Sequence, residues 1–567
     1  MNQTPAGDDV RQFDRVAQSG PTPASPTVNG HVPRRKAPSA TDDVGSDRER
    51  PTKIPPRRPV RTDRVPAIRE WTMLLPVLAL GLVFRLRDLT QPFIGDASWN
   101  EVFYASIARN FRIYGPLTQY SLGAAESGRT PLVPDFGPSP LVPWLVYLSG
   151  RALGPSEWAA RFPILILGML SLVILYYVAR VLYDWQIALA ATFIAAVMPG
   201  IVFYSHLVQL DGPMVTFGLA AVLTLLLFER RRFFWLVAAS CAFLGLAILS
   251  KYSGVLFIPC LAWVWSRMMR RAVPPGNGPQ WPWPAVYFFV AALPAASWFA
   301  YGLKASPAFG ARGPISGYLN RLGVAYLGDW SAAIQGTWPM LANQVGHIFW
   351  YPLIVIVVLS VSTGRFIPFA RRHPEVILLI VPWFAQMIYP KSWLASPHYL
   401  YPALFGLALL LALLVREIAR PASLLLAWPD RNLKIGFVLL GLVACLACAS
   451  DYREFFHAEY YPFYLVTPRD PFYSARFVRS RNSADRPVLA DLPQTLYYAG
   501  DNYVVGRQTW RWWGAAHDDR DMIAAIDSRA FSYVVFTYLP TVEVVDALQQ
   551  DSYRQIAPSA WEKTEAP

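Results

Sequence analysis

Residues 162–178 read FPILILGMLSLVILYYV, and this stretch decides the fold class of the chain. It contains no charged residue and comes close to the roughly 20 apolar residues that cross a bilayer as a helix. A second stretch of the same kind, YLYPALFGLALLLALLV, occupies residues 399–415. Together the two stretches predict a polytopic α-helical membrane protein rather than a soluble globule.

The composition of the whole chain of 567 residues agrees with that prediction. Hydrophobic residues make up 54% and charged residues 16%, whereas soluble proteins have about 45–50% and about 25%. From the apolar blocks we expect about eleven transmembrane helices. Their approximate positions are 71–86, 159–181, 187–204, 212–228, 233–250, 253–268, 284–302, 346–363, 374–390, 399–415 and 433–450.

The net charge of +13 is explained by membrane topology. Arginine and lysine mark loops on the cytoplasmic side of a membrane. If residues 1–66 lie in the cytoplasm, every connection that then falls on that side is basic, for example residues 230–232, 267–271 and 365–372. This distribution argues against a nucleic-acid-binding face. It also places residues 451–567 on the outer side of the membrane.

The chain is predicted to have three parts. Residues 1–66 are rich in proline and charge and poor in aromatic residues, which predicts a disordered cytoplasmic tail. Residues 67–450 form a membrane domain, and 451–567 form a small outer α/β domain. The elements expected in the last part are strands at 488–492, 497–505 and 533–538 and helices at 522–526 and 542–549.

The first outer loop, residues 87–157, is too polar to cross a membrane. Within it we expect two helices at the membrane surface, over 99–114 and 141–148. Projected as a helix, the first of them has one apolar face, with Glu101 at the side of that face.

Charged side chains that could carry chemistry gather at the outer ends of the predicted helices. Asp96 and Glu101 flank the start of one helix, Asp211 opens another, and Lys251 and His398 lie at later outer ends. Ionisable groups at such places are candidates for function, because they are costly in hydrocarbon. Each also has a structural explanation: acids cap helix starts, and Lys251 and His398 suit the interface.

Five segments of the chain carry a family resemblance. They are NEVFYASIARN (100–110), SPLVPWLVYLSGRALGPSEWAARFP (139–163), YSHLVQLDGPM (204–214), LSKYSGVLFIP (249–259) and SPHYLYPAL (396–404). In this order they resemble the GT-C superfamily of polyprenyl-phosphate-sugar-dependent glycosyltransferases, in the branch of protein O-mannosyltransferases and lipid A aminoarabinose transferases. The likeness covers about residues 85–415.

The resemblance implies a GT-C-like membrane fold and a reaction. A sugar on a polyprenyl phosphate reaches the outer leaflet, and an acceptor hydroxyl attacks its anomeric carbon with inversion while the lipid phosphate leaves. The attack needs a carboxylate base, and the leaving phosphate needs cations or hydrogen-bond donors. The donor sugar stays open, as does the acceptor, which is a protein, lipid A, a wall polysaccharide or another polyprenyl glycan.

The resemblance also implies site residues. In the family the first-loop motif reads Asp-Glu before Tyr-Ala, with the aspartate as base; aligned on Tyr104, that position is Asn100 here. Because asparagine does not serve as a base, we expect Asp96 or Glu101 to act instead, with Asp96 ranked first. Asp211 matches the acid of the second outer loop, which orients the first-loop helix or the substrate. The residues expected to bind substrate are Asn100, Tyr104, Arg109, Lys251, His398 and Tyr399.

We expect no cofactor and no metal, because a lipid monophosphate can leave without one. Asp96, Glu101 and Asp211 could nonetheless hold a divalent cation together. Arg161 matches an arginine that opens the family's second span, and we expect a structural role for it. The four cysteines lie inside apolar blocks without metal-site spacing, which favours simple burial: Cys241, Cys260, Cys445 and Cys448.

Two other classes of protein remain as alternatives. A transporter or flippase for polyprenyl-linked sugars would place its charges at the bilayer midplane on broken helices, whereas these charges lie at helix ends. Asn100 leaves open a non-catalytic glycolipid-binding scaffold. The expected partners are a polyprenyl-phosphate-linked sugar, an acceptor protein, lipid or glycan, and membrane lipids, with no nucleic acid. The expected location is the plasma (inner) membrane.

Overall fold

The computed structural model describes large parts of the membrane domain and of the C-terminal part. The described residues are 67–93, 98–116, 139–272, 282–305, 341–385, 397–426, 441–454, 472–482, 486, 488–491, 493–499, 504–505, 520–527, 531–536 and 540–564. The tail predicted over residues 1–66 lies outside them, and so does Asp96.

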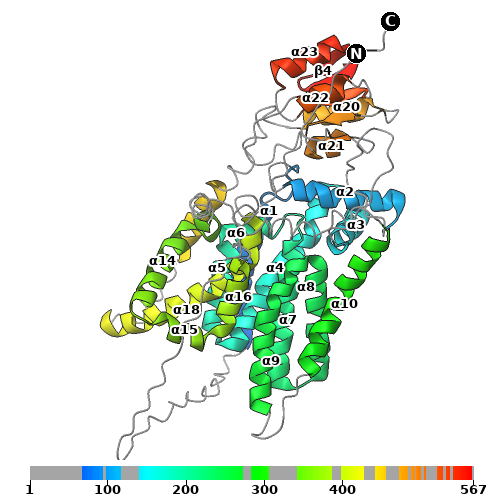
Figure 1. The fold of residues 1–567 in the computed structure, drawn as a ribbon. Helices are drawn as coiled ribbons and strands as arrows, with labels where there is room; N and C mark the ends of the chain where they lie inside the picture. Colours follow the sequence, from blue (N-terminus) through cyan, green and yellow to red (C-terminus); the bar gives the residue numbers. More distant parts are fainter. Residues whose placement is uncertain are drawn as a thin grey trace, which may run out of the picture. The chain divides into compact units, whose positions relative to one another are not determined.

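Helices dominate the described part of the membrane domain (Figure 1). Their bounds are α1 (Ala67–Leu86), α2 (Ser98–Tyr114), α3 (Leu141–Leu153), α4 (Glu157–Leu182), α5 (Trp185–Val197), α6 (Pro199–Tyr204), α7 (Asp211–Arg231), α8 (Phe234–Ser250), α9 (Ile258–Ala272), α10 (Pro282–Ala305), α14 (His347–Ser362), α15 (Phe366–Arg372), α16 (Pro374–Ala385) and α18 (Tyr401–Leu426). Two 3-10 turns, η1 (Tyr252–Phe257) and η3 (Pro397–Leu400), precede α9 and α18.

Four helices in the described part are long and apolar enough to cross a membrane: Glu157–Leu182, Asp211–Arg231, Trp283–Ala305 and His398–Glu417. Helices α14 and α15 make a fifth candidate as one span bent by 106°. Shorter apolar helices cover Leu141–Leu153, Trp185–Val197, Phe234–Ser250 and Pro374–Phe384. The chain is therefore a multi-pass helical membrane protein, whereas the number of about eleven spans stays a prediction.

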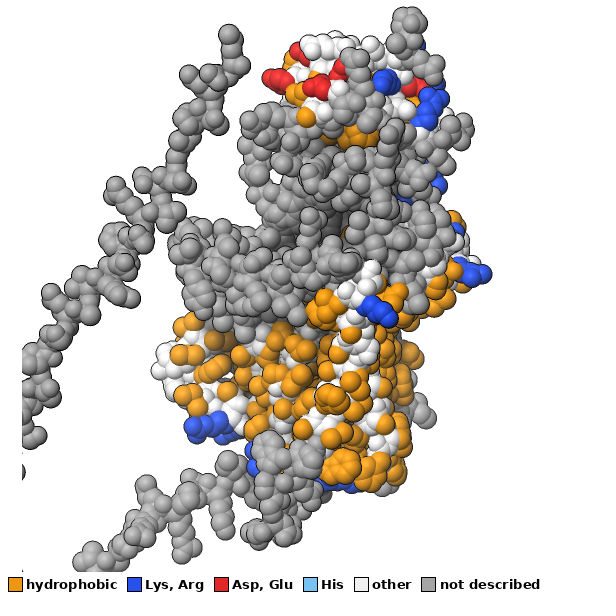
Figure 2. Space-filling model, turned by 45° about the vertical axis from the view of Figure 1, so that its right-hand side comes forward, with side chains coloured by type: hydrophobic (Ala, Val, Ile, Leu, Met, Phe, Trp, Pro, Cys, Tyr) orange, Lys and Arg blue, Asp and Glu red, His pale blue; other side chains and the backbone are white. Residues whose placement is uncertain are grey.

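The face of the helix bundle that Figure 2 shows is largely apolar. Hydrophobic side chains cover much of it, and lysine and arginine are sparse among them (Figure 2). On α10, the side chains of Trp283, Phe289 and Val290 are exposed. A continuous apolar surface of this kind is typical of a face that contacts lipid.

The C-terminal ends of α4, α7 and α9 lie together. Arg230 of α7 donates to the Val181 carbonyl of α4. Arg267 of α9 pairs with Glu229 of α7 at 2.5 Å and with Glu375 of α16. Because their ends meet, the three helices run in the same direction. The last turns of α4, α7 and α9, each of which carries at least one arginine, are thus at one end of the bundle, and the N-terminal ends of these helices are at the other.

Both helices predicted in the first outer loop are present, as α2 and α3. They pack against each other, and α3 also packs against α4. The sequence predicted that Glu101 lies at the side of the buried apolar face of α2. In the structure Glu101 is fully buried, and Ala105 and Ala108 are buried as well. The reason is an ion pair with Arg161, described below, which draws the acidic side of the helix into the protein.

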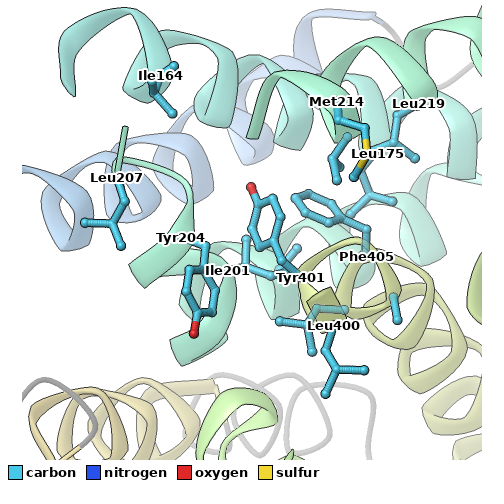
Figure 3. Packing of buried hydrophobic residues seen from close by; sticks show 14 of the residues in the cluster. Ile164, Leu175, Ile201, Tyr204, Leu207, Met214, Leu219, Leu400, Tyr401 and Phe405 are labelled. Carbon is cyan, nitrogen blue, oxygen red and sulfur yellow. The ribbon is translucent and has the colours of Figure 1, made fainter. Parts of the chain in front are cut away.

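Close packing shapes the region between α4, α7 and α18. Figure 3 shows Tyr401 and Phe405 of α18 among Leu175 and Met214 of the neighbouring helices. The rings of Tyr204 and Tyr401 meet edge to face with their centroids 6.0 Å apart. These side chains are all buried. The helix ends that carry the candidate site are therefore supported by a closely packed hydrophobic core.

The C-terminal part contains a five-stranded sheet in the order β2-β1-β3-β5-β4. Strand β1 is parallel to β2 and β3, whereas β5 is antiparallel to β3 and β4. The strands are β1 (Val488–Ala490), β2 (Val504–Val505), β3 (Tyr533–Val535), β4 (Tyr553–Ala557) and β5 (Ala560–Lys563). The helices are α20 (Tyr473–Arg481), α21 (Pro493–Ala499), α22 (Arg520–Asp527) and α23 (Val542–Gln550).

The strand predicted over residues 497–505 is wrong in its first three residues. Residues 497–499 belong to helix α21 and Val504–Val505 form strand β2, while residues 500–503 lie outside the described residues. The aromatic run had favoured a strand, but Pro493 is well suited to the first turn of a helix. Leu496 and Ala499 are fully buried on that helix, so tertiary packing outweighs the local strand preference.

Candidate functional site

A buried ion pair joins the first outer loop to the helix bundle. Arg161 of α4 donates from Nε to Oε1 and from Nη2 to Oε2 of Glu101 in α2, both at 2.8 Å. Neither side chain is exposed to solvent. Glu101 Oε1 also accepts the Val208 N–H at 3.1 Å. With both oxygens engaged, Glu101 fits a group that holds structure better than one that takes a proton from an acceptor.

Arg161 also fixes the segment that follows α1, residues 88–93, which we call the anchor segment. The Phe93 ring lies under the guanidinium of Arg161, 5.0 Å from its carbon to the ring centroid. From Nη1, Arg161 donates to the main-chain carbonyls of Asp88, Leu89 and Gln91. One arginine therefore holds both the anchor segment and the carboxylate of α2.

The connection between α6 and α7, residues 205–210, is held from two further helices. Arg85 of α1 donates from Nε to Ser205 Oγ at 2.6 Å and from Nη1 to the Ala196 carbonyl at 3.1 Å. Gly168 of α4 lies so close that a Cβ there would stand 2.4 Å from the Ser205 carbonyl oxygen. Only glycine permits this approach, so the position of the connection is closely defined.

Asp211 and Lys251 form a second ion pair where α7 begins and α8 ends. Lys251 Nζ donates to Oδ1 and Oδ2 of Asp211 at 2.8 and 2.9 Å. The Asp211 side chain is 4% exposed and that of Lys251 is 13% exposed. Helix α7 starts at Asp211 itself and has no side-chain cap. The alternative explanation of Asp211 as an N-cap is therefore wrong.

Two aromatic residues from η3 complete this second cluster. Lys251 Nζ lies 4.3 Å from the Tyr399 ring centroid. The ring of His398 lies 4.6 Å from that of Tyr399 and 6.4 Å from that of Tyr204. Lys251 is thus a partly exposed cation between a carboxylate and an aromatic face, a setting in which it could also contact a phosphate.

The structure brings two of the three predicted carboxylates to one short stretch of chain. Glu101 binds the main chain at Val208, and Asp211 lies three residues further along. Asp96, the first-ranked base, is outside the described residues. The predicted convergence of all three carboxylates therefore remains a prediction.

The other predicted binding residues lie along α2. Tyr104 is buried, and Asn100 is partly exposed one position before Glu101. Arg109 donates from Nη1 to the Tyr497 carbonyl at 3.3 Å, and its guanidinium lies 4.7 Å from the Tyr497 ring centroid. Arg109 therefore contacts helix α21 of the C-terminal part.

Sequence reasoning missed Arg85, and it placed His206 in the second outer loop beside Asp211 without a role. Arg85 is fully buried, and a single charge at the end of an apolar stretch is a signal that could have found it. His206 is buried and its Nδ1 lies 3.1 Å from the Val202 carbonyl. Burial, aided by the charge of Arg161, lowers the pKa of His206 to about 4. His206 is therefore neutral at neutral pH.

The described residues include no group of three or more histidine, cysteine, aspartate or glutamate side chains that could hold a metal ion. Glu101 and Asp211 each already face a cation of the protein. That pairing leaves them poorly suited as ligands of a divalent ion. The expectation of a metal-free reaction stays a prediction, since Asp96 lies outside the region described.

Comparisons with known proteins agree with this architecture. Residues 137–300, which include Arg161, Asp211 and Lys251, match the family described as dolichyl-phosphate-mannose-protein mannosyltransferase. ArnT from Cupriavidus metallidurans, solved with bound undecaprenyl phosphate, is similar with a TM-score of 0.57 and 14% identity, over 87% of this chain and 97% of that chain. A sequence comparison with curated proteins gives no match.

A second solved structure is similar over most of the chain. It is the oligosaccharyltransferase of Archaeoglobus fulgidus tethered with an acceptor peptide, with a TM-score of 0.52 and 14% identity, over 83% of this chain and 69% of that chain. Both solved structures are GT-C glycosyltransferases. The chain therefore has the fold of the GT-C superfamily, which confirms the resemblance found in the sequence.

Proposed function

We propose that the chain transfers a sugar from a polyprenyl-phosphate donor to an acceptor hydroxyl, with inversion at the anomeric carbon, at the outer face of the membrane. The observation that carries this proposal is the Asp211–Lys251 pair, which lies beside His398 and Tyr399 in a GT-C fold. Support for a lipid donor comes from ArnT with bound undecaprenyl phosphate and from the archaeal enzyme in complex with a dolichol-phosphate.

The ion pairs suggest a division of roles. In the proposal Lys251, which is partly exposed, stabilises the negative charge that develops on the leaving lipid phosphate. Asp211 holds the Lys251 ammonium in place through both oxygens. Asp96 is the proposed base that takes the proton of the acceptor hydroxyl. Glu101 is left with a positioning role, because Arg161 already occupies its carboxylate.

The proposed side of the membrane rests on the two ends of the bundle. The arginine-bearing last turns of α4, α7 and α9 lie at one end, and cytoplasmic loops are the ones enriched in arginine. The ion pairs of Glu101 and Asp211 lie at the opposite ends of α4 and α7. We therefore propose that the site, like the C-terminal part, faces outward in the plasma membrane, with the N-terminal tail in the cytoplasm.

The test is sugar transfer by the full-length protein in lipid nanodiscs. Synthetic polyprenyl-phosphate hexoses and pentoses serve as donors, and release of polyprenyl phosphate is measured in the presence of candidate acceptors. Asp211→Asn is expected to lower kcat at least about 100-fold, as loss of a carboxylate does in acid–base and charge-assisted sites. The matched control is Asp184→Asn, whose carboxylate pairs with Arg416 next to the start of α5.

Three results would contradict the proposal. One is the absence of donor-dependent turnover in the wild-type protein, and another is full turnover in Asp211→Asn. The third is transbilayer movement of a fluorescent polyprenyl-phosphate sugar without cleavage, which would instead support a flippase. Mass spectrometry of membrane glycans from cells with and without the chain then identifies the acceptor and the sugar.

A further inference from the structure

One tyrosine of the C-terminal part binds both the anchor segment and the start of α4. Tyr498 of α21 accepts the Phe93 N–H at 2.8 Å and donates its own hydroxyl proton to Glu157 Oε1 at 2.9 Å. Phe93 is 1% exposed and Tyr498 is 7% exposed. A single hydroxyl therefore joins three elements that are far apart in the sequence.

The direction of this hydroxyl is set by the packing of its ring. The Tyr498 ring stacks on that of Phe472, with centroids 4.5 Å apart and planes inclined by 24°. The guanidinium carbon of Arg476 also lies over the Tyr498 ring, 4.9 Å from its centroid. Burial raises the pKa of Tyr498, and the nearby charge of Glu157 raises it further. The hydroxyl thus stays protonated and keeps donating to Glu157.

The anchor segment connects Tyr498 to the two ion pairs. The Phe93 amide is bound by Tyr498, while the Phe93 ring lies under Arg161. Arg161 binds Glu101, and Glu101 holds the N–H of Val208 in the connection between α6 and α7. Each contact in this series is buried, so a shift of Phe93 is passed on to the connection that ends at Asp211.

We propose that Tyr498 is a positioning residue for sugar transfer. Through the two hydrogen bonds of the Tyr498 hydroxyl, the C-terminal part holds the anchor segment in place against Arg161. In this way it fixes the connection between α6 and α7, which leads directly into Asp211. This inference rests on the proposed function for its catalytic consequence, but its structural step is testable without it. Tyr498 does not contact the reacting atoms in this scheme and acts only through Phe93 and Arg161.

The variant Tyr498→Phe isolates the hydroxyl. It keeps the ring that packs against Phe472 and Arg476, and it leaves the contact of Arg109 with Tyr497 untouched. The matched control is Tyr533→Phe, because the Tyr533 hydroxyl is also buried and also donates to a glutamate, Glu562, at 3.0 Å. That contact lies within the sheet, between β3 and β5, away from the anchor segment.

The first measurement is hydrogen–deuterium exchange of the full-length protein in nanodiscs. In Tyr498→Phe we expect faster exchange of peptides that cover residues 88–93 and 205–211, because the Phe93 N–H loses its acceptor and the series of contacts loosens. Tyr533→Phe should leave both peptides as in the wild type. Unchanged exchange of these peptides in Tyr498→Phe would overturn the proposal, whatever the activity of the protein.

The second measurement is steady-state transfer from the polyprenyl-phosphate sugar. Loss of one buried hydrogen-bonding hydroxyl is expected to lower kcat about tenfold while KM for the donor changes less than about twofold. Faster exchange combined with an unchanged kcat would also overturn a role in positioning, since the hydroxyl would then serve stability alone. If the wild type shows no transfer, the proposed function fails, and the exchange result alone decides whether Tyr498 holds the anchor segment.

A second, milder variant keeps the proposal testable if Tyr498→Phe does not fold. Glu157→Gln keeps an acceptor for the Tyr498 hydroxyl but removes its charge, so the same changes are expected in smaller size. If Tyr498→Phe does not fold, Glu157→Gln must still accelerate exchange of residues 88–93. Exchange equal to that of the wild type would then count against the proposal.

Discussion

Arg161 and Glu101 face each other in a fully buried ion pair with two parallel hydrogen bonds of 2.8 Å. The two residues are 60 positions apart and bring α4 and α2 together. A buried pair of this kind costs desolvation energy, and its net contribution to stability is small when both partners are replaced. Removal of one partner is different, because the other charge is then left without compensation.

We therefore predict that Glu101→Gln destabilises the protein strongly. An unpaired buried Arg161 costs about 3–5 kcal/mol, which should appear as a lower melting temperature of the protein in nanodiscs. The matched control is Glu562→Gln, which removes the ion pair with Arg481, a side chain 46% exposed and 3.0 Å away, while the glutamine oxygen still accepts the hydrogen bond from the Tyr533 hydroxyl. Its loss should cost about 1 kcal/mol or less. Equal melting temperatures of the two variants would show that the Arg161–Glu101 pair does not hold α2 to α4.

Gly168 provides a second prediction, about the connection between α6 and α7. In Gly168→Ala the new methyl group meets the Ser205 carbonyl oxygen at 2.4 Å and Ser205 Cβ at 2.7 Å. The methyl group is fixed to the backbone of α4 and the oxygen belongs to the backbone of Ser205, so the clash displaces the connection. We expect the free energy of unfolding to fall by about 1–3 kcal/mol. The control is Gly150→Ala in α3, where the nearest atom is Arg112 Nη2 at 3.7 Å. That change should be neutral or slightly stabilising, so a stable Gly168→Ala would refute the close approach.

Lys251 gives a prediction about chemistry rather than stability. In Lys251→Met the leaving phosphate loses its proposed cation, and kcat for sugar transfer should fall about 100-fold or more. Lys251→Arg keeps the charge and should retain part of the activity. Lys304→Met, which removes an exposed lysine at the end of α10, is the control. Wild-type turnover in Lys251→Met would remove Lys251 from the site.

The sequence predicts the fold class well because the membrane imposes a strong pattern. Uncharged stretches such as 162–178 have few alternatives to a buried helix, and α4 indeed covers them. The helix at 99–114 follows from its period of apolar residues and is present as α2. The fold implied by the GT-C resemblance, which was read from five short segments, is confirmed by solved structures that share only 14% identity.

The sequence alone could not predict which charged residues pair with each other. An acid near a helix start fits a cap, a base and a buried ion pair equally well, and Glu101 and Asp211 both stand at such places. Only the fold shows that Arg161 and Lys251 are their partners. The first residues of the strand expected at 497–505 are helical for a related reason, since burial of α21 against the rest of the protein is not encoded in local propensity.

His206 provides a prediction about pH. Its pKa of about 4 in the folded protein compares with an ordinary value of 6.5. Between these values the unfolded chain binds a proton that the folded protein does not, so the free energy of unfolding falls as the pH is lowered from 6.5 towards 4. This difference in pKa corresponds to a decrease of roughly 3 kcal/mol in the free energy of unfolding. We expect the melting temperature of the wild-type protein to fall over this range.

The variant His206→Asn tests the assignment. Its amide nitrogen can take over the hydrogen bond from Nδ1 to the Val202 carbonyl, but the side chain does not titrate. The variant should therefore melt with a weaker dependence on pH between 6.5 and 4. Asp88 acts in the opposite direction, because burial raises its pKa and its protonation favours the folded state at low pH. If wild type and His206→Asn lose stability in parallel on acidification, other groups carry the effect and His206 is not the source.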